Sequence, residues 1–253
     1  MTDFNGEQPV TDQPDTLYST PWQQLGQFRF DEAVAQVFPD MIRRSVPGYG
    51  HVVGLSGLIA KRFAQPETYL YDIGCSLGAT TLALATQVTE PRCRIGAIDP
   101  SQAMLAEARR IAADTPDAHI PIDWIEADAR DYAYAPCSVV TLNFTLQFIP
   151  IEERLALLTR LAEAMVPGGC LILAEKTCVQ EPDSQQVLTD VHHDFKRANG
   201  YSELEIAQKR ASIENFLIPE TEEVHITRLK AAGFHTVTGF FHCLNFRGWM
   251  AQV

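Results

Sequence analysis

The stretch that decides the fold is Tyr69-Leu70-Tyr71-Asp72-Ile73-Gly74-Cys75-Ser76-Leu77-Gly78-Ala79-Thr80. Its apolar run indicates a strand that is covered on both faces, and Gly74 permits a tight turn where a Cβ would collide with a ligand. We expect a helix over residues 77–88 directly after the loop, with the free N–H groups of its first turn aimed at whatever lies above. The stretch therefore predicts a cradle for a cofactor.

The spacing of the two glycines indicates which cofactor the cradle holds. A dinucleotide fingerprint has glycines at its first, third and sixth positions, whereas this loop has Gly74 and Gly78 with three residues between them, which disfavours NAD. The order acid, any residue, glycine, three residues, glycine is similar to the first motif of the S-adenosylmethionine-dependent Rossmann-like enzymes. Most of these enzymes have glycine where this chain has Ser76. The alternative is an ordinary strand-to-helix turn with a satisfied Asp72.

The composition of the chain limits its partners. With 253 residues, of which 46% are hydrophobic, the chain can bury one full α/β core and is expected to form one domain. Its formal charge of −12 argues against direct binding to nucleic acid or anionic lipid, both of which need clustered Lys and Arg. No apolar run is long enough to span a bilayer, and the N-terminus is polar and acidic, so we expect no membrane segment and a cytoplasmic protein.

The cysteines and histidines do not indicate a metal site. The six cysteines, at positions 75, 93, 137, 170, 178 and 243, lack the spacing of a zinc site, so we expect reduced thiols. His192 and His193 are adjacent and would point in different directions on a helix, so they cannot ligate one metal from this spacing. We expect them to be surface or packing residues.

The order of elements predicts the fold class. We expect a disordered acidic tail over residues 1–14 and one Rossmann-like S-adenosylmethionine-binding domain over residues 15–253. The domain begins with a helical lid over residues 30–66, in which a short turn after Pro39 separates two helices. Alternating elements follow, with strands at 69–73, 94–98, 121–125, 138–142 and 170–174 and helices at 77–88, 101–113 and 151–165. Such alternation predicts parallel strands joined by crossover helices.

The last third of the chain breaks the alternation. A helical insertion is expected at about 183–219, and Pro167-Gly168-Gly169 is expected to turn the preceding helix into its strand. A helix over residues 222–232 then leads to a hairpin of residues 236–240 and 243–251, whose last strand runs antiparallel. The prediction is an α/β fold with a mostly parallel seven-stranded sheet and an antiparallel last strand.

Polar residues at three strand ends are the candidate ligand contacts, because ligands of such sheets bind outside the carboxyl ends of the strands. Asp99 could accept hydrogen bonds from both ribose hydroxyls of a nucleoside, and Asp128 could accept one from the exocyclic amine of an adenine. A turn aspartate and a helix cap are the alternatives for these two residues. Asn143 interrupts an apolar run, so its amide needs a partner in the site or in the backbone. Tyr49 could stack on the ligand or pack against nearby valines.

Longer strings carry a family resemblance over roughly residues 15–249. The chain closely resembles the carboxy-S-adenosyl-L-methionine synthase family of bacterial wobble-uridine modification. The strings that carry the resemblance are Phe38-Pro39-Asp40-Met41-Ile42, Arg44-Ser45-Val46-Pro47-Gly48-Tyr49, Gly74-Cys75-Ser76-Leu77-Gly78, Leu142-Asn143-Phe144-Thr145-Leu146-Gln147-Phe148, and residues 192–206 from His192-His193-Asp194-Phe195 to Glu203-Leu204-Glu205-Ile206.

The resemblance implies a reaction and its participants. S-adenosylmethionine and prephenate would give carboxy-S-adenosylmethionine and phenylpyruvate in a homodimeric enzyme, and another protein would carry out the tRNA step. Prephenate would aromatise with release of carbon dioxide and hydroxide; hydroxide would take a methyl proton, and the resulting ylide would capture the carbon dioxide. Such chemistry depends on positioning and water exclusion more than on protein acids and bases.

The resemblance also implies the site residues. Arg210 matches the family's carboxylate-binding arginine, and Arg210 and Tyr49 would act by positioning, with no general base assigned. Pro100 stands where some members have asparagine, so only a backbone contact is expected there. The positions that match nucleotide contacts are Tyr49, Gly74, Cys75, Ser76, Asp99, Pro100, Asp128, Ala129 and Asn143.

Two other functions remain open from the residues alone. An ordinary small-molecule or tRNA methyltransferase would share the whole cofactor site. A non-catalytic partner subunit that binds a nucleoside would keep the pocket without the chemistry.

Overall fold

The structure of the protein, a computed structural model, describes residues 14–20, 29–115, 118–213 and 216–253. Apart from Pro14, the predicted tail over residues 1–14 lies outside the described residues. In chain order the elements are α1 (Glu32–Ser45), α2 (Tyr49–Phe63), β1 (Tyr69–Ile73), α3 (Ala79–Gln87), β2 (Arg94–Asp99), α4 (Gln102–Ala113), β3 (Ile122–Glu126), β4 (Cys137–Asn143), the 3-10 turn η1 (Leu146–Phe148), α5 (Ile151–Ala164), β5 (Met165–Cys178), α6 (Pro182–Ala198), α7 (Glu203–Ile213), β6 (Glu220–Thr221), α8 (Glu222–Ala231), β7 (Thr236–Cys243) and β8 (Phe246–Gln252).

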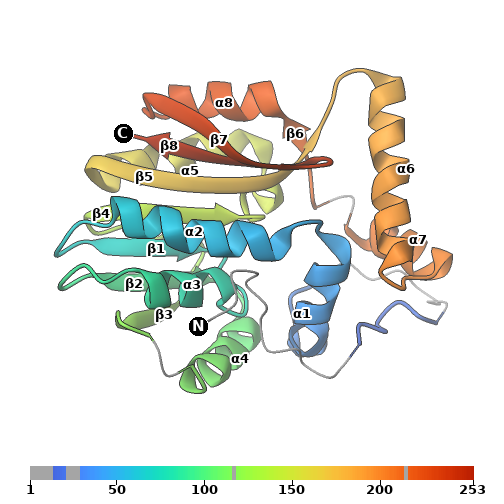
Figure 1. Cartoon of the computed structure of the whole chain (residues 1–253), viewed down its shortest axis with the longest axis horizontal. Coiled ribbons are helices and arrows are strands. Elements are labelled where there is room, and N and C mark those ends of the chain that lie inside the picture. Colours follow the sequence, from blue (N-terminus) through green and yellow to red (C-terminus); the bar gives the residue numbers. More distant parts are fainter. Residues whose placement is uncertain (1–13, 21–28, 116–117, 214–215) are drawn as a thin grey trace.

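One sheet organises these elements, in the order β3-β2-β1-β4-β5-β8-β7 (Figure 1). The first five strands of this path pair in parallel, and β8 runs antiparallel to both β5 and β7. The predicted seven strands and the antiparallel last strand are therefore confirmed. The chain leaves β1 toward β2 on one side and returns to β4 on the other, so the strand order reverses between β1 and β4. Ligands bind at the carboxyl side of such a reversal.

Alternating side chains of the strands build a core on each face of the sheet. Leu70 and Val139 pack with Leu84 and other residues of α2 and α3 on one face. Tyr71 and Val140 pack with residues of α5 and α8 on the other. Because neighbouring residues of a strand point to opposite faces, a strand covered on both faces is mostly apolar, as Leu70, Tyr71 and Ile73 are.

Two predicted turns differ in the structure. Pro39 lies inside α1, so the helix continues to Ser45, and the turn between the lid helices falls at residues 46–48. The buried side chains of Val37 and Met41, one on each side of Pro39, pack in the same cluster and offset the lost backbone hydrogen bond. The turn expected at residues 167–169 forms an irregular start of β5, where the register against β4 shifts and Gly168 has φ of 80°.

β6 is an additional two-residue strand that no sequence pattern predicted. It exists because β5 continues past Ala174 to Cys178, where Thr177 and Cys178 pair with Glu220 and Thr221.

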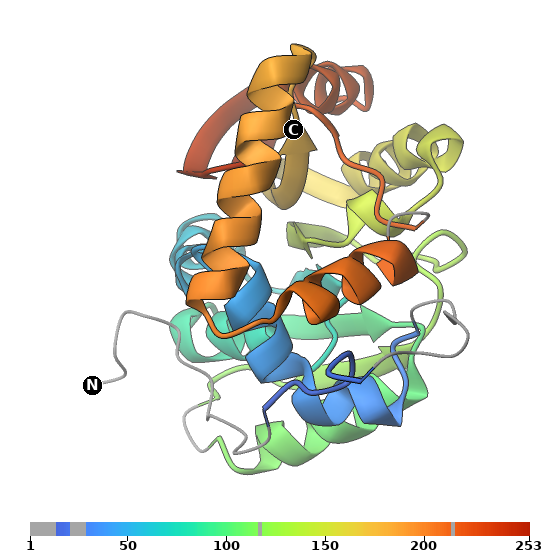
Figure 2. The same ribbon diagram turned by 90° about the vertical axis from the view of Figure 1, so that its right-hand side faces the viewer.

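The lid and the insertion lie across the carboxyl ends of the strands. Figure 2 looks at this edge, and α1, α6 and α7 cross in front of the sheet. α6 begins at Pro182, close to the expected start of the insertion, and the Glu181 carboxylate accepts hydrogen bonds from the first backbone N–H groups of the helix. The insertion therefore covers the region where the fold places a ligand.

Candidate functional site

The glycine loop has the shape of a cradle. Gly74 has φ of 70°, and a Cβ at this position would lie 2.3 Å from Thr145 Oγ1. Gly78 has φ of 82°, and a Cβ there would lie 2.7 Å from the Trp124 ring. Both positions need glycine for conformation and for space, so the backbone of the loop comes close to its surroundings.

Ser76 adopts a backbone conformation that favours glycine. Its φ is 51°, in the left-handed region, which explains why glycine is common at this place in related enzymes. Its backbone N–H donates to Asp99 Oδ2 at 2.9 Å, and its hydroxyl contacts Met104 Sδ at 3.7 Å. Beside it, the Cys75 side chain is buried, so this residue offers the cavity mainly its backbone.

Asp99 ends β2 and is held by the loop and by the start of α4. Its carboxylate accepts from the N–H of Ser76 and, at 2.8 Å, from that of Ser101. Burial raises the pKa of the side chain, which is 8% exposed. Each carboxylate oxygen can accept a further hydrogen bond, so the geometry suits two hydroxyl donors on one ligand. Pro100 lines the same cavity.

Asp72 is satisfied by protein groups, as the alternative reading of the loop expected. The hydroxyls of Thr81 and Thr141 donate to its two oxygens at 2.6 and 2.7 Å. Burial raises its pKa to about 6. This aspartate therefore ties α3 to β1 and β4 and supports the loop from beneath, while the loop itself faces a cavity.

Asp128 is paired with an arginine that the sequence analysis did not single out. Arg130 donates to both carboxylate oxygens, with Nε–Oδ1 2.9 Å and Nη2–Oδ2 2.6 Å, and hydrogen bonding from Arg130 lowers the pKa of Asp128. The backbone N–H of Arg130 also donates to Asp128, so the residue closes a turn and caps no helix. Asp128 and the buried Ala129 line the cavity.

Asn143 presents an unpaired acceptor to the cavity. Its Nδ2 donates to the hydroxyls of Ser56 and Thr80, each at 3.0 Å, which fixes the orientation of the amide. Its Oδ1 is buried and has no hydrogen-bond partner among the described residues. A buried acceptor without a partner is costly, so this oxygen is suited to an N–H or O–H of a bound molecule. The Asn143 oxygen and the close approach permitted by Gly74 and Gly78 suit a ligand made of a nucleoside and an amino acid.

These residues surround one cavity of about 750 Å³. Tyr49 forms part of its wall: its ring lies 6.0 Å from that of Phe144, and it packs beside Val46, so it both lines the cavity and belongs to a small core. Phe30 and Phe38 contact each other edge to face, and Phe30 contacts Phe148 in the same way. All three line the cavity and give it an apolar wall beside the glycine loop.

The far side of the cavity is cationic. Lys176 of β5, Lys196 of α6, and Lys209 and Arg210 of α7 line it. Burial and the neighbouring cations lower the pKa of Lys196 to about 7, and burial and Arg210 lower that of Lys176. Arg210 is exposed at the rim of the cavity. Only Arg210 of this group was predicted.

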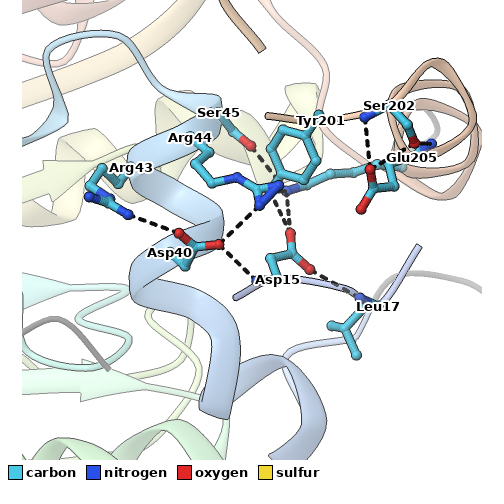
Figure 3. Close-up of polar contacts among 10 residues, drawn as sticks. Asp15, Leu17, Asp40, Arg43, Arg44, Ser45, Tyr201, Ser202 and Glu205 are labelled. Carbon is cyan, nitrogen blue, oxygen red and sulfur yellow. Dashed lines mark hydrogen bonds and ion pairs between the residues drawn. The ribbon is translucent and has the colours of Figure 1, made fainter. Parts of the chain in front are cut away.

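Lys209 already has an anionic partner. Its Nζ lies 3.5 Å from Asp15 Oδ2 and donates to the Ser45 hydroxyl at 3.0 Å. Figure 3 shows Asp15 between α1 and Tyr201: its N–H donates to Asp40 at 2.7 Å, and the Tyr201 hydroxyl donates to its carboxylate. We call Asp15, Asp40, Ser45, Tyr201 and Lys209 the latch, because it joins the segment before α1 to the lid and the insertion.

Glu175 is a second buried group that sequence reasoning missed. Its carboxylate accepts from the backbone N–H groups of Leu146 and Gln147 at 2.8 and 3.0 Å, which fixes η1 next to Asn143. Burial raises its pKa to about 8. Its position at the end of a predicted strand was the available signal, and the same signal applied to Lys176. No sequence signal marked Lys196, because it lies on the insertion.

His192 and His193 also line the cavity, although neither was singled out as a site residue. His192 is buried, its Nε2 lies 2.8 Å from the Ser45 carbonyl oxygen, and its ring contacts that of Phe246, so the packing interpretation holds for it.

All six cysteines are free thiols, and four of them are buried. In the parts of the chain that the structure describes, no cluster of three or more His, Cys, Asp or Glu could hold a metal, and no helix is both long and apolar enough to cross a membrane.

Comparisons with known proteins agree with this architecture. A family model described as "Methyltransferase domain" matches residues 70–169. Human N-acetylserotonin methyltransferase in complex with SAM is similar with a TM-score of 0.55 at 17% identity, over 93% of this chain and 60% of that chain. An O-methyltransferase family protein from Burkholderia thailandensis has a TM-score of 0.61 at 16% identity, over 91% of this chain and 65% of that chain. These structures show the Rossmann-like methyltransferase fold.

Relatives that are similar in sequence identify the enzyme family. A carboxy-S-adenosyl-L-methionine synthase from Trichlorobacter lovleyi is 49% identical over 96% of this chain and 99% of its own length. The protein of the same name from Klebsiella pneumoniae is 48% identical over 94% of this chain and 96% of its own length. The chain therefore belongs to the carboxy-S-adenosyl-L-methionine synthase family.

Proposed function

We propose that the enzyme makes carboxy-S-adenosyl-L-methionine from S-adenosyl-L-methionine and prephenate, with release of phenylpyruvate. Family membership supports the product, and the sequence resemblance supports the donor. The observation that carries the proposal is the charge distribution of the cavity, with the Asp99 carboxylate beside its glycine loop and Lys176, Lys196 and Arg210 on β5, α6 and α7.

The glycine-loop side suits S-adenosylmethionine as substrate. Asp99 would accept from the ribose hydroxyls, and Asp128 and Ala129 would border the adenine. The unpaired Oδ1 of Asn143 would accept from the amino group of the methionine part, because an ammonium needs an acceptor when it leaves water. The loop of Gly74, Cys75 and Ser76 and the ring of Tyr49 would enclose the rest of the molecule, with a backbone contact from Pro100.

The cationic side distinguishes carboxylation from methylation. A sulfonium is repelled by nearby cations, so a plain methyltransferase gains nothing from Arg210 and two lysines in the same cavity. A carboxylate reverses this sign. Arg210 would hold the carboxylate of the product through two parallel hydrogen bonds, while the sulfonium attracts it from the other side.

The chemistry balances without a protein acid or base. Prephenate loses its ring carboxylate as carbon dioxide and its ring hydroxyl as hydroxide, which leaves phenylpyruvate. Hydroxide takes one proton from the methyl group to give water, and the methyl carbon forms a bond to carbon dioxide. The protein must hold the two substrates together and exclude bulk water, and the lid helix α1, with the insertion helices α6 and α7, covers the strand ends for this purpose (Figure 2).

We place the product in 5-oxyacetyl modification of wobble uridine in tRNA, with the tRNA step on another protein. The net charge of −12 supports a tRNA step on another protein, since a direct tRNA contact needs a basic surface.

We further propose a homodimer. On α6, Val187 and Val191 are exposed one helical turn apart, which suits a contact with a second copy.

Mass spectrometry of the ligand that copurifies with the protein tests the proposal. Carboxy-S-adenosylmethionine is the expected ligand. S-adenosylmethionine or S-adenosylhomocysteine alone, with no product formed on addition of prephenate, would favour an ordinary methyltransferase. The absence of any turnover with either substrate would favour a non-catalytic nucleoside-binding subunit.

A further inference from the structure

We propose that Lys176 and Lys196 form a second anion subsite. It binds the carboxylate that prephenate does not transfer, which remains in phenylpyruvate. The assignment rests on the proposed function, because it requires a donor with two carboxylates. The transferred carboxylate is the one that Arg210 takes, so the two anions of the donor have separate cationic partners in one cavity.

The two lysines are cations without a counter-charge in the protein. Both line the cavity and are only partly exposed. Neither ammonium group has a carboxylate or hydrogen-bond partner in the part of the chain that the structure describes. Lys209 differs, because Asp15 already balances it. A half-buried cation without a partner is costly to the fold, and an anionic ligand removes that cost.

The lysines come from two elements that are fixed independently. The backbone N–H of Lys176 donates to Gln147 Oε1 at 3.0 Å, and its strand pairs with β8 opposite Phe246. On α6, His192 lies one helical turn before Lys196 and anchors that turn by its 2.8 Å contact with Ser45 and its packing on Phe246. Lys176, His192 and Lys196 all line the same cavity, so the strand and the helix bring both ammonium groups to its wall.

Separate subsites are useful because only one of the two carboxylates of prephenate loses its charge in the reaction. The carboxylate that departs as carbon dioxide must lose its charge during the reaction, so strong binding of that group alone would oppose the chemical step. Binding energy from the carboxylate that does not react carries no such penalty and positions the ring beside the sulfonium. Lys176 and Lys196 would therefore set donor affinity and select dicarboxylates over monocarboxylates.

Steady-state kinetics with prephenate test this assignment in Lys176→Met and Lys196→Met. We expect the KM for prephenate to rise about tenfold or more in each variant, since a charge-assisted hydrogen bond is lost. The KM for S-adenosylmethionine should stay within about twofold. Lys196→Arg should recover part of the prephenate affinity, because it keeps the charge. Lys230→Met on α8 is the matched control, since Lys230 is exposed and outside the cavity, and it should change neither constant.

Binding of the two products separates the lysines from Arg210. Phenylpyruvate carries only the retained carboxylate, so calorimetry should show weaker phenylpyruvate binding in the lysine variants and little change in carboxy-S-adenosylmethionine binding. Arg210→Ala should show the reverse. Equal loss of both ligands in a lysine variant, or unchanged prephenate KM and phenylpyruvate binding, would overturn the subsite. A wild-type protein that binds phenylpyruvate through these lysines but does not convert prephenate would refute the proposed function and keep the subsite.

Discussion

Ser76 and Asp99 show how one hydrogen bond links the cradle to the ligand site. The left-handed backbone of Ser76 aims its N–H at Asp99, and this contact orients a carboxylate that burial would otherwise disfavour as an anion. The loop and the strand end therefore depend on each other.

Asp99→Ala removes this acceptor. We expect S-adenosylmethionine to bind more weakly by about 1.5 to 3 kcal/mol, because two hydrogen bonds from ribose hydroxyls to a carboxylate are lost. Calorimetry measures the change, and Asp99→Asn, which keeps one acceptor, should lie between the wild type and Asp99→Ala. Unchanged affinity in Asp99→Ala would return this residue to the role of a turn aspartate.

Ser76→Gly tests whether the loop depends on serine. Glycine adopts the left-handed region without strain but gains freedom in the unfolded state, and these effects oppose each other. We expect a net change within about 1 kcal/mol, which corresponds to a Tm shift of roughly 2 to 4 °C for a domain of this size. S-adenosylmethionine affinity should fall, because the loop is less rigid. Equal affinity in wild type and variant would show that the serine is incidental.

Glu175 makes a residue-scale prediction about pH. Its folded pKa of about 8 lies above the ordinary value of 4.5, so the folded state holds a proton that the unfolded state has lost between these values. The contribution of Glu175 to the free energy of unfolding is therefore fully present below about pH 4.5 and is lost as the pH rises to about 8. The loss is roughly 1.4 kcal/mol for each unit by which the folded pKa is raised. Denaturant unfolding of Glu175→Gln should lack this decline. A parallel pH dependence in wild type and variant would contradict it.

At the scale of elements, the latch holds the insertion over the strand ends. It joins residues far apart in the sequence, since Asp15 and Tyr201 are 186 positions apart, and Lys209 is adjacent to Arg210 on α7. The position of Arg210, for which we propose a role in carboxylate binding, therefore depends on a buried ion pair near the N-terminus (Figure 3).

Asp15→Asn should loosen this arrangement. The variant leaves the Lys209 ammonium buried without its counter-charge, and we expect a loss of roughly 2 to 4 kcal/mol in unfolding free energy. Hydrogen exchange should rise first in α7. Asp194→Asn is the control, because its pair with Arg197 is largely exposed and should contribute little. A similar small effect in both variants would show that the latch does not hold α7.

The elements that sequence predicted well are those with a local signature. The predicted strand at 69–73 coincides with β1, because an apolar run meets a glycine at its end. The helix predicted over residues 101–113 matches α4, which Ser101 caps, since its hydroxyl accepts from the Met104 N–H. The turn after Pro39 was wrong, because tertiary packing of α1 outweighed the local cost of proline. β6 depends on pairing with a distant strand and carries no local pattern.

At the scale of the whole molecule, some site residues could also be predicted from local sequence, and others depend on how the chain folds. Asp99, Asp128 and Asn143 could be located because the topology brings strand ends to one edge. The cavity unites all ten predicted site residues, from Tyr49 to Arg210. Lys176, Lys196 and the latch could not be assigned from sequence, since their roles follow from how the lid and insertion fold back over the sheet.

The whole molecule thus gathers in one cavity the residues for which we propose nucleoside binding and those for which we propose anion binding. Carbon-13 in the ring carboxylate of prephenate follows this transfer directly. After incubation with S-adenosylmethionine, mass spectrometry should find the label in carboxy-S-adenosylmethionine and none in phenylpyruvate. Formation of S-adenosylhomocysteine without a labelled carboxylated product would contradict the account.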